Sequence, residues 1–238
     1  MAAGRKIAIV VATALLVVAA RAQHRQTFAP HELTTGDAPP PIEWLPPDLP
    51  RRSVELESAE ERKLKVVVVA KHLEQPWSVA FLPDGSMLVT ERAGRLRLVK
   101  DGTLEDEPVA GVPQVQPGGP RGLQGLMDVA LHPEFERNRW VYLTYHKPTA
   151  YGEGATTLAR GTWNGTGLTD VRDVFESGAT GTEASRIVFG RDGMIYMSIS
   201  APGSPQIKRS QDPGDYAGKV VRLRDDGTVP DDNPFVGR

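Results

Sequence analysis

The sequence of 238 residues contains no cysteine. Disulfide bonds, thiolate metal sites and cysteine nucleophiles are therefore excluded, and the stability of the fold must come from packing. Two common enzyme motifs are also missing. There is no Gly-x-Ser-x-Gly segment, and the Gly-Lys pair at residues 218–219 is followed by Val220, where a phosphate-binding loop needs serine or threonine. The five histidines show no metal-ligand spacing, so we assign none of them to a site.

The first 22 residues have the pattern of an export signal. Arg5 and Lys6 precede an apolar run of fourteen residues, and residues 20–22 (Ala-Arg-Ala) have the small-x-small form that signal peptidase cuts. The run is shorter than the roughly 20 residues that a membrane-spanning helix needs. We therefore expect residues 1–22 to be a signal peptide, with no membrane span left after cleavage. The mature protein is then exported to the periplasm or outside the cell.

Negative charge dominates the expected mature chain. Removal of residues 1–22 leaves 25 Lys and Arg against 30 Asp and Glu, a net charge of −5. An acidic protein is a poor match for a phosphate backbone, so nucleic acid is not an expected partner. The acidic pairs at residues 225–226 and 231–232 lack the spacing of a calcium loop and lie near glycine or proline, which favours turns. We expect no metal site in this chain.

Residues 23–64 form a polar, proline-rich segment. Proline lacks the backbone N–H group that a strand ladder needs, so we expect an arm or linker here rather than part of a sheet. The charged residues 54–62 predict one short helix within this arm. Nothing in the segment indicates chemistry.

A strand–turn–strand pattern recurs three times after residue 65. The β-branched run at 65–70 opens the folded domain, and Gly (24 residues) and Pro (20 residues) are enriched between short apolar runs. The three paired runs are 77–81 with 87–90, 126–131 with 140–144, and 185–189 with 195–198. Phe81, Leu131 and Phe189 each end the first run of a pair, and they stand 50 and 58 residues apart. This interval predicts an all-β fold of the β-propeller type, with one such hairpin in each blade.

Further strands are expected at 95–99, 157–163 and 219–223, which makes about three blades. Three blades do not close on themselves in the usual way, and the last one would leave an apolar face uncovered. We expect either a fragment or closure by association.

Three longer segments, at residues 122–135, 185–193 and 218–234, carry a family resemblance. Together with Gln75-Pro76-Trp77 and residues 89–92, in this order, they resemble the soluble glucose/sorbosone (aldose sugar) dehydrogenases that use pyrroloquinoline quinone (PQQ). The resemblance covers residues 65–238. It implies a six-bladed propeller that oxidises an aldose or related polyol, with a sugar and an electron acceptor as partners. In that family a histidine removes the proton of the sugar hydroxyl and a hydride passes to PQQ.

The position of the family histidine is altered in this chain. It lies four residues before the arginine that matches Arg186, and Thr182 stands there. A threonine hydroxyl is too weak a base to replace imidazole at neutral pH. Glu183 is the ionisable neighbour, and its carboxylate is our candidate catalytic base, provided that burial raises its pKa and that a loop or bulge aims it into the channel.

The resemblance also implies cofactor-binding residues. These are Arg186, Gln124, which lies one position beyond the Leu123 that replaces the family glutamine, and Gln206. Ser200-Ala201 stands where the family has Gly-Asp. An ordinary loop hydrogen bond is the alternative role for each of the two glutamines.

The later basic residues of the family, its calcium ligands and its remaining blades would lie beyond residue 238. Calcium is therefore possible only in a full-length protein, and we expect this chain alone to be inactive. The rival hypothesis is a propeller that binds a carbohydrate or a protein without catalysis, which the departures at Thr182, Leu123 and Ala201 make credible.

Overall fold

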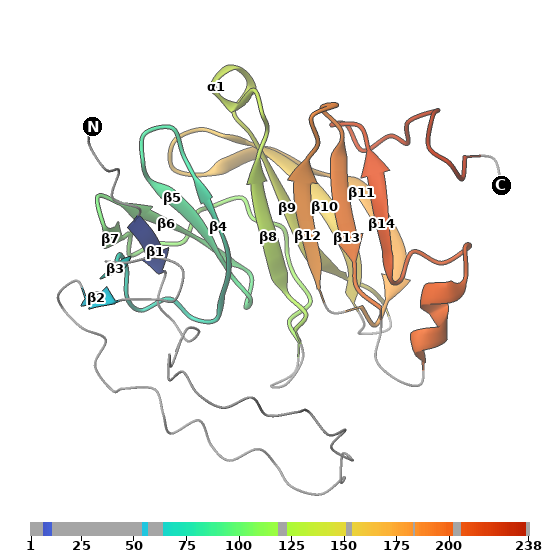
Figure 1. Cartoon of the computed structure of the whole chain (residues 1–238), viewed down its shortest axis with the longest axis horizontal. Helices are drawn as coiled ribbons and strands as arrows, with labels where there is room; N and C mark the ends of the chain where they lie inside the picture. Colours follow the sequence, from blue (N-terminus) through green and yellow to red (C-terminus); the bar gives the residue numbers. More distant parts are fainter. Residues whose placement is uncertain are drawn as a thin grey trace, which may run out of the picture. The chain divides into compact units, whose positions relative to one another are not determined.

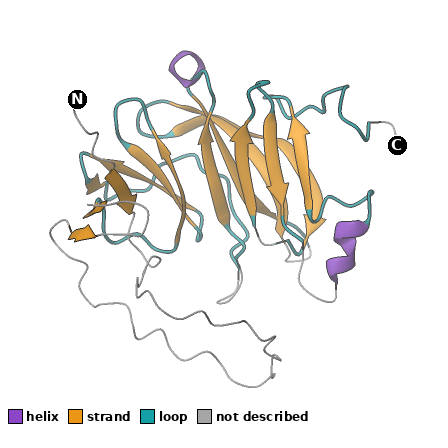
Figure 2. Cartoon of the chain, in the orientation of Figure 1, coloured by secondary structure: helices purple, strands orange, loops and turns teal. Residues whose placement is uncertain are grey.

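The computed structural model describes the strands at residues 7–10 and 54–56 and residues 64–118, 123–150, 154–182, 184–201 and 206–236. The chain divides into two compact units, residues 1–71 and 72–238. Strands dominate the described residues, whose only helices are the single turn α1 (Phe135–Asn138) and the 3-10 helix η1 (Gln206–Gln211) (Figure 2). Neither described helix is long enough to cross a membrane.

The first unit contains one small sheet with the order β1-β3-β2. β3 (Leu64–Val68) pairs in parallel with β1 (Ile7–Val10) and antiparallel with β2 (Val54–Leu56). The helix expected over 54–62 is wrong at residues 54–56, and so is the expectation that the arm forms no ladder. Two apolar residues flank Glu55 there, and this alternation suits a strand. Residues 57–63 lie outside the described part, and the signal peptide stays a prediction.

The second unit consists of three antiparallel sheets. Figure 1 shows them side by side along the chain order. The first has the order β4-β5-β6-β7, with β4 (Pro76–Phe81), β5 (Met87–Glu91), β6 (Arg95–Lys100) and β7 (Thr103–Leu104). The second is β8 (Leu126–Leu131), β9 (Trp140–Pro148), β10 (Gly154–Trp163) and β11 (Leu168–Thr180). The third is β12 (Ser185–Phe189), β13 (Ile195–Ile199) and β14 (Lys219–Leu223). The all-β prediction is confirmed, and the open row of sheets is that of a partial propeller.

The three repeated hairpins are the three pairs β4–β5, β8–β9 and β12–β13. Local chemistry explains the first and third turns. Gly85 and Gly193 adopt φ of 87° and 76°, which side chains with a Cβ rarely adopt. Asp84 and Asp192 accept hydrogen bonds from main-chain N–H groups two residues later. These hairpins were therefore predictable from sequence.

Two strands of the second unit were not predicted. β7 has only two residues, and β11 is an outermost strand of thirteen residues whose side chains are largely partly buried or exposed. Its pairing with β10 shifts register at three points. Two of these shifts insert one extra residue into β11 and so move the side chains that follow to the other face. No simple alternation therefore appears in the sequence.

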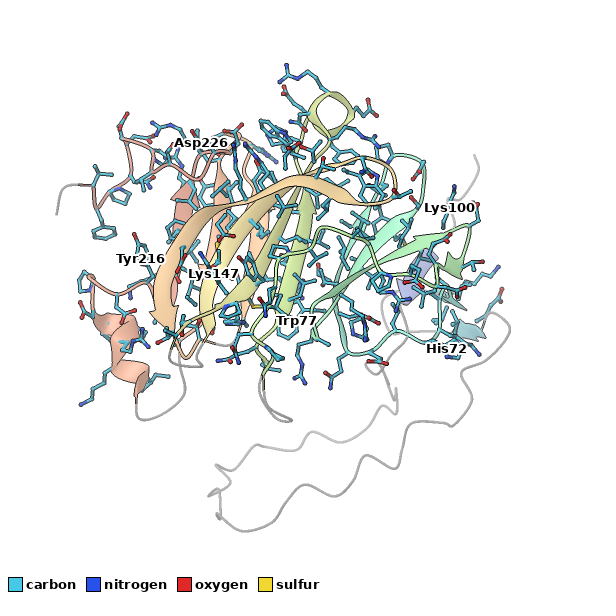
Figure 3. The ribbon with its side chains drawn as sticks, turned by 180° about the vertical axis from the view of Figure 1, so that it is seen from behind. His72, Trp77, Lys100, Lys147, Tyr216 and Asp226 are labelled. Carbon is cyan, nitrogen blue, oxygen red and sulfur yellow. The ribbon has the colours of Figure 1, made fainter. Side chains whose placement is uncertain are left out.

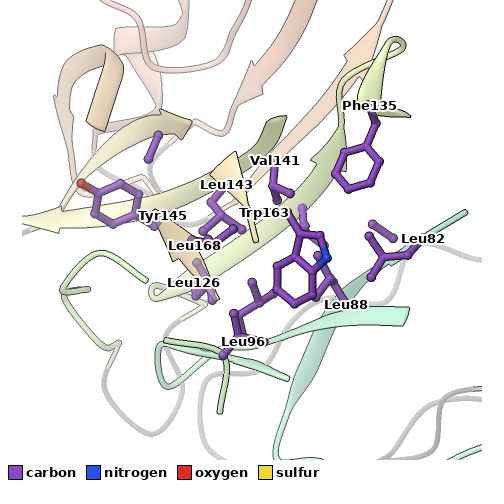
Figure 4. Close-up of a cluster of buried hydrophobic side chains, with 14 residues drawn as sticks. Leu82, Leu88, Leu96, Leu126, Phe135, Val141, Leu143, Tyr145, Trp163 and Leu168 are labelled. Atoms are coloured by element: carbon purple, nitrogen blue, oxygen red, sulfur yellow. The ribbon is translucent and has the colours of Figure 1, made fainter. Parts of the chain in front are cut away.

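Two apolar layers lie between the sheets. The first and second sheets bury one cluster, drawn in Figure 4, in which Leu88 and Leu96 of the first sheet face Leu126, Leu143 and Trp163 of the second. The second and third sheets bury another, which joins Tyr142 and Leu158 to Ile195, Met197 and Leu223. Blade-on-blade packing of this kind buries the apolar faces that each sheet cannot cover alone.

The first strands of the sheets, β4, β8 and β12, are neighbours, since β8 contacts both of the others. The turns that follow them gather at one end: His132 packs edge-on against Phe189, with ring centroids 5.2 Å apart, and lines a pocket of about 520 Å³ with Pro83. We call the opposite end, where β4, β8 and β12 begin, the entry end. In Figure 3 it carries the labelled Trp77, away from Asp226.

Candidate functional site

Hydrogen bonds between sheets tie the entry end together. The main-chain N–H of Leu126 donates to the carbonyl of Arg92 over 3.1 Å, which links the second sheet to the first. The Gln124 amide donates to the carbonyl of Thr182 over 3.5 Å, which links the second sheet to the segment that opens the third. The structure therefore brings Gln124, Thr182 and Arg186 to one end of the fold.

Arg186 presents a cation at this end. Its side chain is 61% exposed, although β12 begins one residue earlier. Nη1 lies 3.3 Å from Asp128 Oδ1, and Nη2 donates to the main-chain carbonyl of Trp77 over 3.4 Å. The guanidinium carbon lies 6.0 Å from the centre of the Trp77 ring. The guanidinium is thus held on one side and open to solvent on the other.

Asp128 was missed by the sequence reasoning. It lies on β8 where the pairing with β9 shifts register between Leu126 and Val129, and its N–H donates to the Thr144 hydroxyl. The residue is only 5% exposed. No motif in the sequence marks it, because the partners of its carboxylate on the first and third sheets are 50 to 59 residues away.

Thr182 is fully buried and its hydroxyl points into the second sheet. The oxygen lies 2.6 Å from the hydroxyl oxygen of Thr156 on β10. The chain therefore offers no exposed hydroxyl at the position of the family histidine.

His146, on β9, is a second residue that sequence reasoning left unassigned. Its ring is fully buried beneath Thr182, and Nδ1 lies 3.1 Å from the Gly125 N–H, which donates to it. Burial lowers the pKa of His146. The ring contacts the main chain of Gly125 and Thr182 at the entry end and has no access to solvent. Its role is therefore structural.

The other candidates are only partly described. Glu183 lies outside the described residues. Gln206 begins η1, and its side chain lies outside the described part of the structure. The helix itself is fixed by Arg209, which binds Asp215 over 2.6 Å and the carbonyl of Thr180 over 2.8 Å.

A buried carboxylate shapes the loops of the first sheet. Glu91, fully buried at the end of β5, accepts from the Glu74 N–H over 2.5 Å and from Arg95 Nε over 2.6 Å. Arg95 also pairs with the Glu74 carboxylate, and Arg97 lies 3.5 Å from Glu91. The pairing with Arg95 holds the pKa of Glu74 below its usual value. This network fixes the loop that leads into β4.

Within the described part of the chain, no group of three or more His, Asp or Glu side chains lies close enough together to hold a metal ion.

Comparison with known proteins identifies the family. The family model described as Glucose / Sorbosone dehydrogenase matches residues 73–238. The chain belongs to this family.

Curated relatives agree with this family. The chain is 40% identical over 203 residues to the uncharacterized protein slr1608 of Synechocystis, which covers 78% of the chain and 49% of that protein. It is 37% identical over 180 residues to the aldose sugar dehydrogenase YliI of Escherichia coli, which covers 73% of the chain and 47% of the relative. The chain therefore spans about half the length of the curated relatives that it matches.

One similar solved structure contains PQQ. The PQQ-bound form of an aldose sugar dehydrogenase from Streptomyces coelicolor superimposes with a TM-score of 0.61 at 28% identity, over 79% of this chain and 53% of that one. The predicted membership and fold are thus confirmed.

The described residues fit a PQQ site of this family in part. PQQ carries carboxylate and quinone oxygens, which accept hydrogen bonds, and Arg186 and Gln124 supply donors at the entry end. Trp77 adds a buried ring N–H that has no partner in the described structure. The position of the family base does not fit, because Thr182 is buried and turned away.

Proposed function

We propose that the full-length protein is an exported, quinoprotein sugar dehydrogenase-like oxidoreductase that oxidises an aldose or a related polyol. Membership of the Glucose / Sorbosone dehydrogenase family supports the reaction class. Within this chain, the observation that carries the proposal is Arg186, a cation held open to solvent at the entry end by Asp128 and the carbonyl of Trp77.

The cofactor in this proposal is PQQ, which when bound supplies a quinone that accepts a hydride from the sugar carbon. Arg186 would hold a carboxylate of the cofactor, because guanidinium groups pair well with carboxylates. Gln124 and Gln206 donate further hydrogen bonds to it. Gln124 already lies beside the segment of Thr182, which brings its amide to the same end as Arg186.

The proton of the sugar hydroxyl is removed by Glu183 in this proposal. The Thr182 hydroxyl is engaged with Thr156 and is too weak a base, and the His146 ring is fully buried. A carboxylate acts at neutral pH when burial against PQQ and sugar raises its pKa. The electrons that leave the sugar would pass in the end to an electron acceptor outside the chain.

Export is supported by residues 1–22, which carry Arg5, Lys6 and an apolar run before Ala-Arg-Ala. Sequencing the amino terminus of the secreted protein tests this: cleavage after residue 22 supports export, and an intact Met1 contradicts it.

The decisive experiment is a titration of the full-length protein with PQQ, with and without calcium. Thermal stability and dye reduction with a panel of aldoses are followed. Binding with turnover is expected. Glu183→Gln should then leave the dissociation constant for PQQ unchanged and abolish turnover. The control is Glu176→Gln, because Glu176 lies exposed on β11, where it pairs with Lys147. This variant should keep both PQQ binding and turnover. Absence of PQQ binding would leave a non-catalytic binding propeller.

A further inference from the structure

Asp128 joins all three sheets through one buried carboxylate. Oδ1 accepts from the Ser78 hydroxyl on β4 over 2.5 Å, and Oδ2 accepts from the main-chain N–H of Ile187 on β12 over 2.7 Å. Oδ1 also accepts from the Val129 N–H over 3.1 Å. The register shift on β8 allows this, because a bulge turns a side chain out of the regular alternation.

The same carboxylate contacts Arg186. Oδ1 lies 3.3 Å from Arg186 Nη1. The Asp128 side chain is 7% exposed and the Arg186 side chain 61% exposed, so the contact joins a buried carboxylate to a cation at the surface. The carbonyl of Trp77 takes the second terminal nitrogen, Nη2. Two acceptors on the rigid first strands therefore fix the plane of the guanidinium group, which a long arginine side chain does not do by itself.

We propose that Asp128 is a positioning residue that orients the Arg186 guanidinium toward a carboxylate-bearing ligand at the entry end. This inference rests on the proposed function, in which the ligand is PQQ. Asp128 is too deeply buried to touch the ligand itself. Its effect passes through Arg186, whose side chain is 61% exposed.

Charge and position predict opposite effects, which makes the inference testable. Asp128→Asn removes a negative charge beside a binding site for an anion, so charge alone would tighten binding. The substitution also replaces an acceptor of Arg186 with a neutral amide, which frees the guanidinium. If Asp128 positions Arg186, binding weakens although the site has become more positive.

The first measurement is the dissociation constant for PQQ of wild-type protein, Asp128→Asn and Ser78→Ala, together with the melting temperature of each. Ser78→Ala removes a bond between the first two sheets without touching Arg186. We expect Asp128→Asn to raise the dissociation constant about tenfold. Ser78→Ala should lower the melting temperature but change the constant by less than about twofold. Unchanged or tighter binding in Asp128→Asn overturns the inference, as does equal weakening in both variants.

The second measurement needs no cofactor. Phenylglyoxal modifies exposed arginines, and mass spectrometry of peptides follows the rate at Arg186. The rate should rise severalfold in Asp128→Asn and stay unchanged in Ser78→Ala, because only the first variant releases the guanidinium. An unchanged rate in Asp128→Asn overturns the inference even if PQQ binds. Failure of the wild-type protein to bind PQQ overturns the proposed function instead, and the modification rate still decides the role of Asp128.

Discussion

A Cβ atom on Gly125 would lie 1.9 Å from the main-chain carbonyl oxygen of Arg92. Gly125 has φ of 139°, and the next N–H, that of Leu126, donates to the same oxygen. The first and second sheets therefore meet backbone to backbone at the entry end. Only glycine permits this approach, which fixes the loop that carries Gln124.

Gly125→Ala should destabilise the protein by about 3 kcal/mol or more, because the main chain of Arg92 cannot yield as a flexible side chain would. Urea unfolding measures the change. The matched control is Gly165→Ala, which also has positive φ (109°) but meets nothing within 4 Å. It should cost only the backbone strain, about 1 kcal/mol. Equal losses would show that the sheets do not touch at Gly125.

The same substitution should change the free energy of unfolding far more at a buried position of a sheet than at an exposed one. Val141 on β9 is fully buried between the first two sheets, whereas Val220 on β14 is 69% exposed. Val141→Ala should lower the free energy of unfolding by about 2 kcal/mol. Val220→Ala should change it by less than about 0.5 kcal/mol. A large loss at Val220 would mean that this face is covered in solution.

Much of the fold could be predicted because its signals are local. The Asp-Gly turns at Gly85 and Gly193, flanked by apolar runs, specify hairpins within about fifteen residues of sequence. The sequence did not predict β11, because its register shifts break the alternation of apolar and polar residues. It did not predict the strand at residues 54–56, because these three residues lie within a charged segment. Secondary structure was thus predictable where an apolar run lies next to a clear turn signal.

The residues of the candidate site could be predicted only from the resemblance to the family. Arg186 and Gln124 were named because they match family positions, and the structure places both at the entry end. Asp128 and His146 could not be named, since their roles depend on contacts with Ile187 and Thr182 across sheets. Such long-range pairs leave no periodic signal in a single sequence.

Acidification should destabilise the fold through His146. Burial lowers its pKa from the ordinary value of 6.5, so between the folded and unfolded pKa values the unfolded chain binds more protons. The free energy of unfolding is therefore undiminished above about pH 6.5 and falls as the pH drops below it. Melting temperatures between pH 7.5 and 5 measure this effect, above the range where carboxylates titrate.

The control for this pH dependence is His146→Gln, which should be less stable at pH 7.5 but show a shallower slope. His132, whose pKa burial also lowers, supplies the remaining slope. A slope that is unchanged in His146→Gln would contradict the assignment to His146.

The buried and exposed ion pairs of the second unit should respond very differently to loss of one charge. Glu91 is fully buried against Arg95 and Arg97, whereas Glu134 pairs with Arg137 at the surface, with side chains 53% and 78% exposed. Glu91→Gln leaves two arginines without their shared partner, one of them nearly buried, and should lower the free energy of unfolding by about 3 kcal/mol. Glu134→Gln should cost less than about 1 kcal/mol, because water replaces the surface pair. Chemical unfolding of the two variants at low and high salt compares them. A loss at Glu91 no larger than that at Glu134 would show that the loop into β4 does not depend on the buried network.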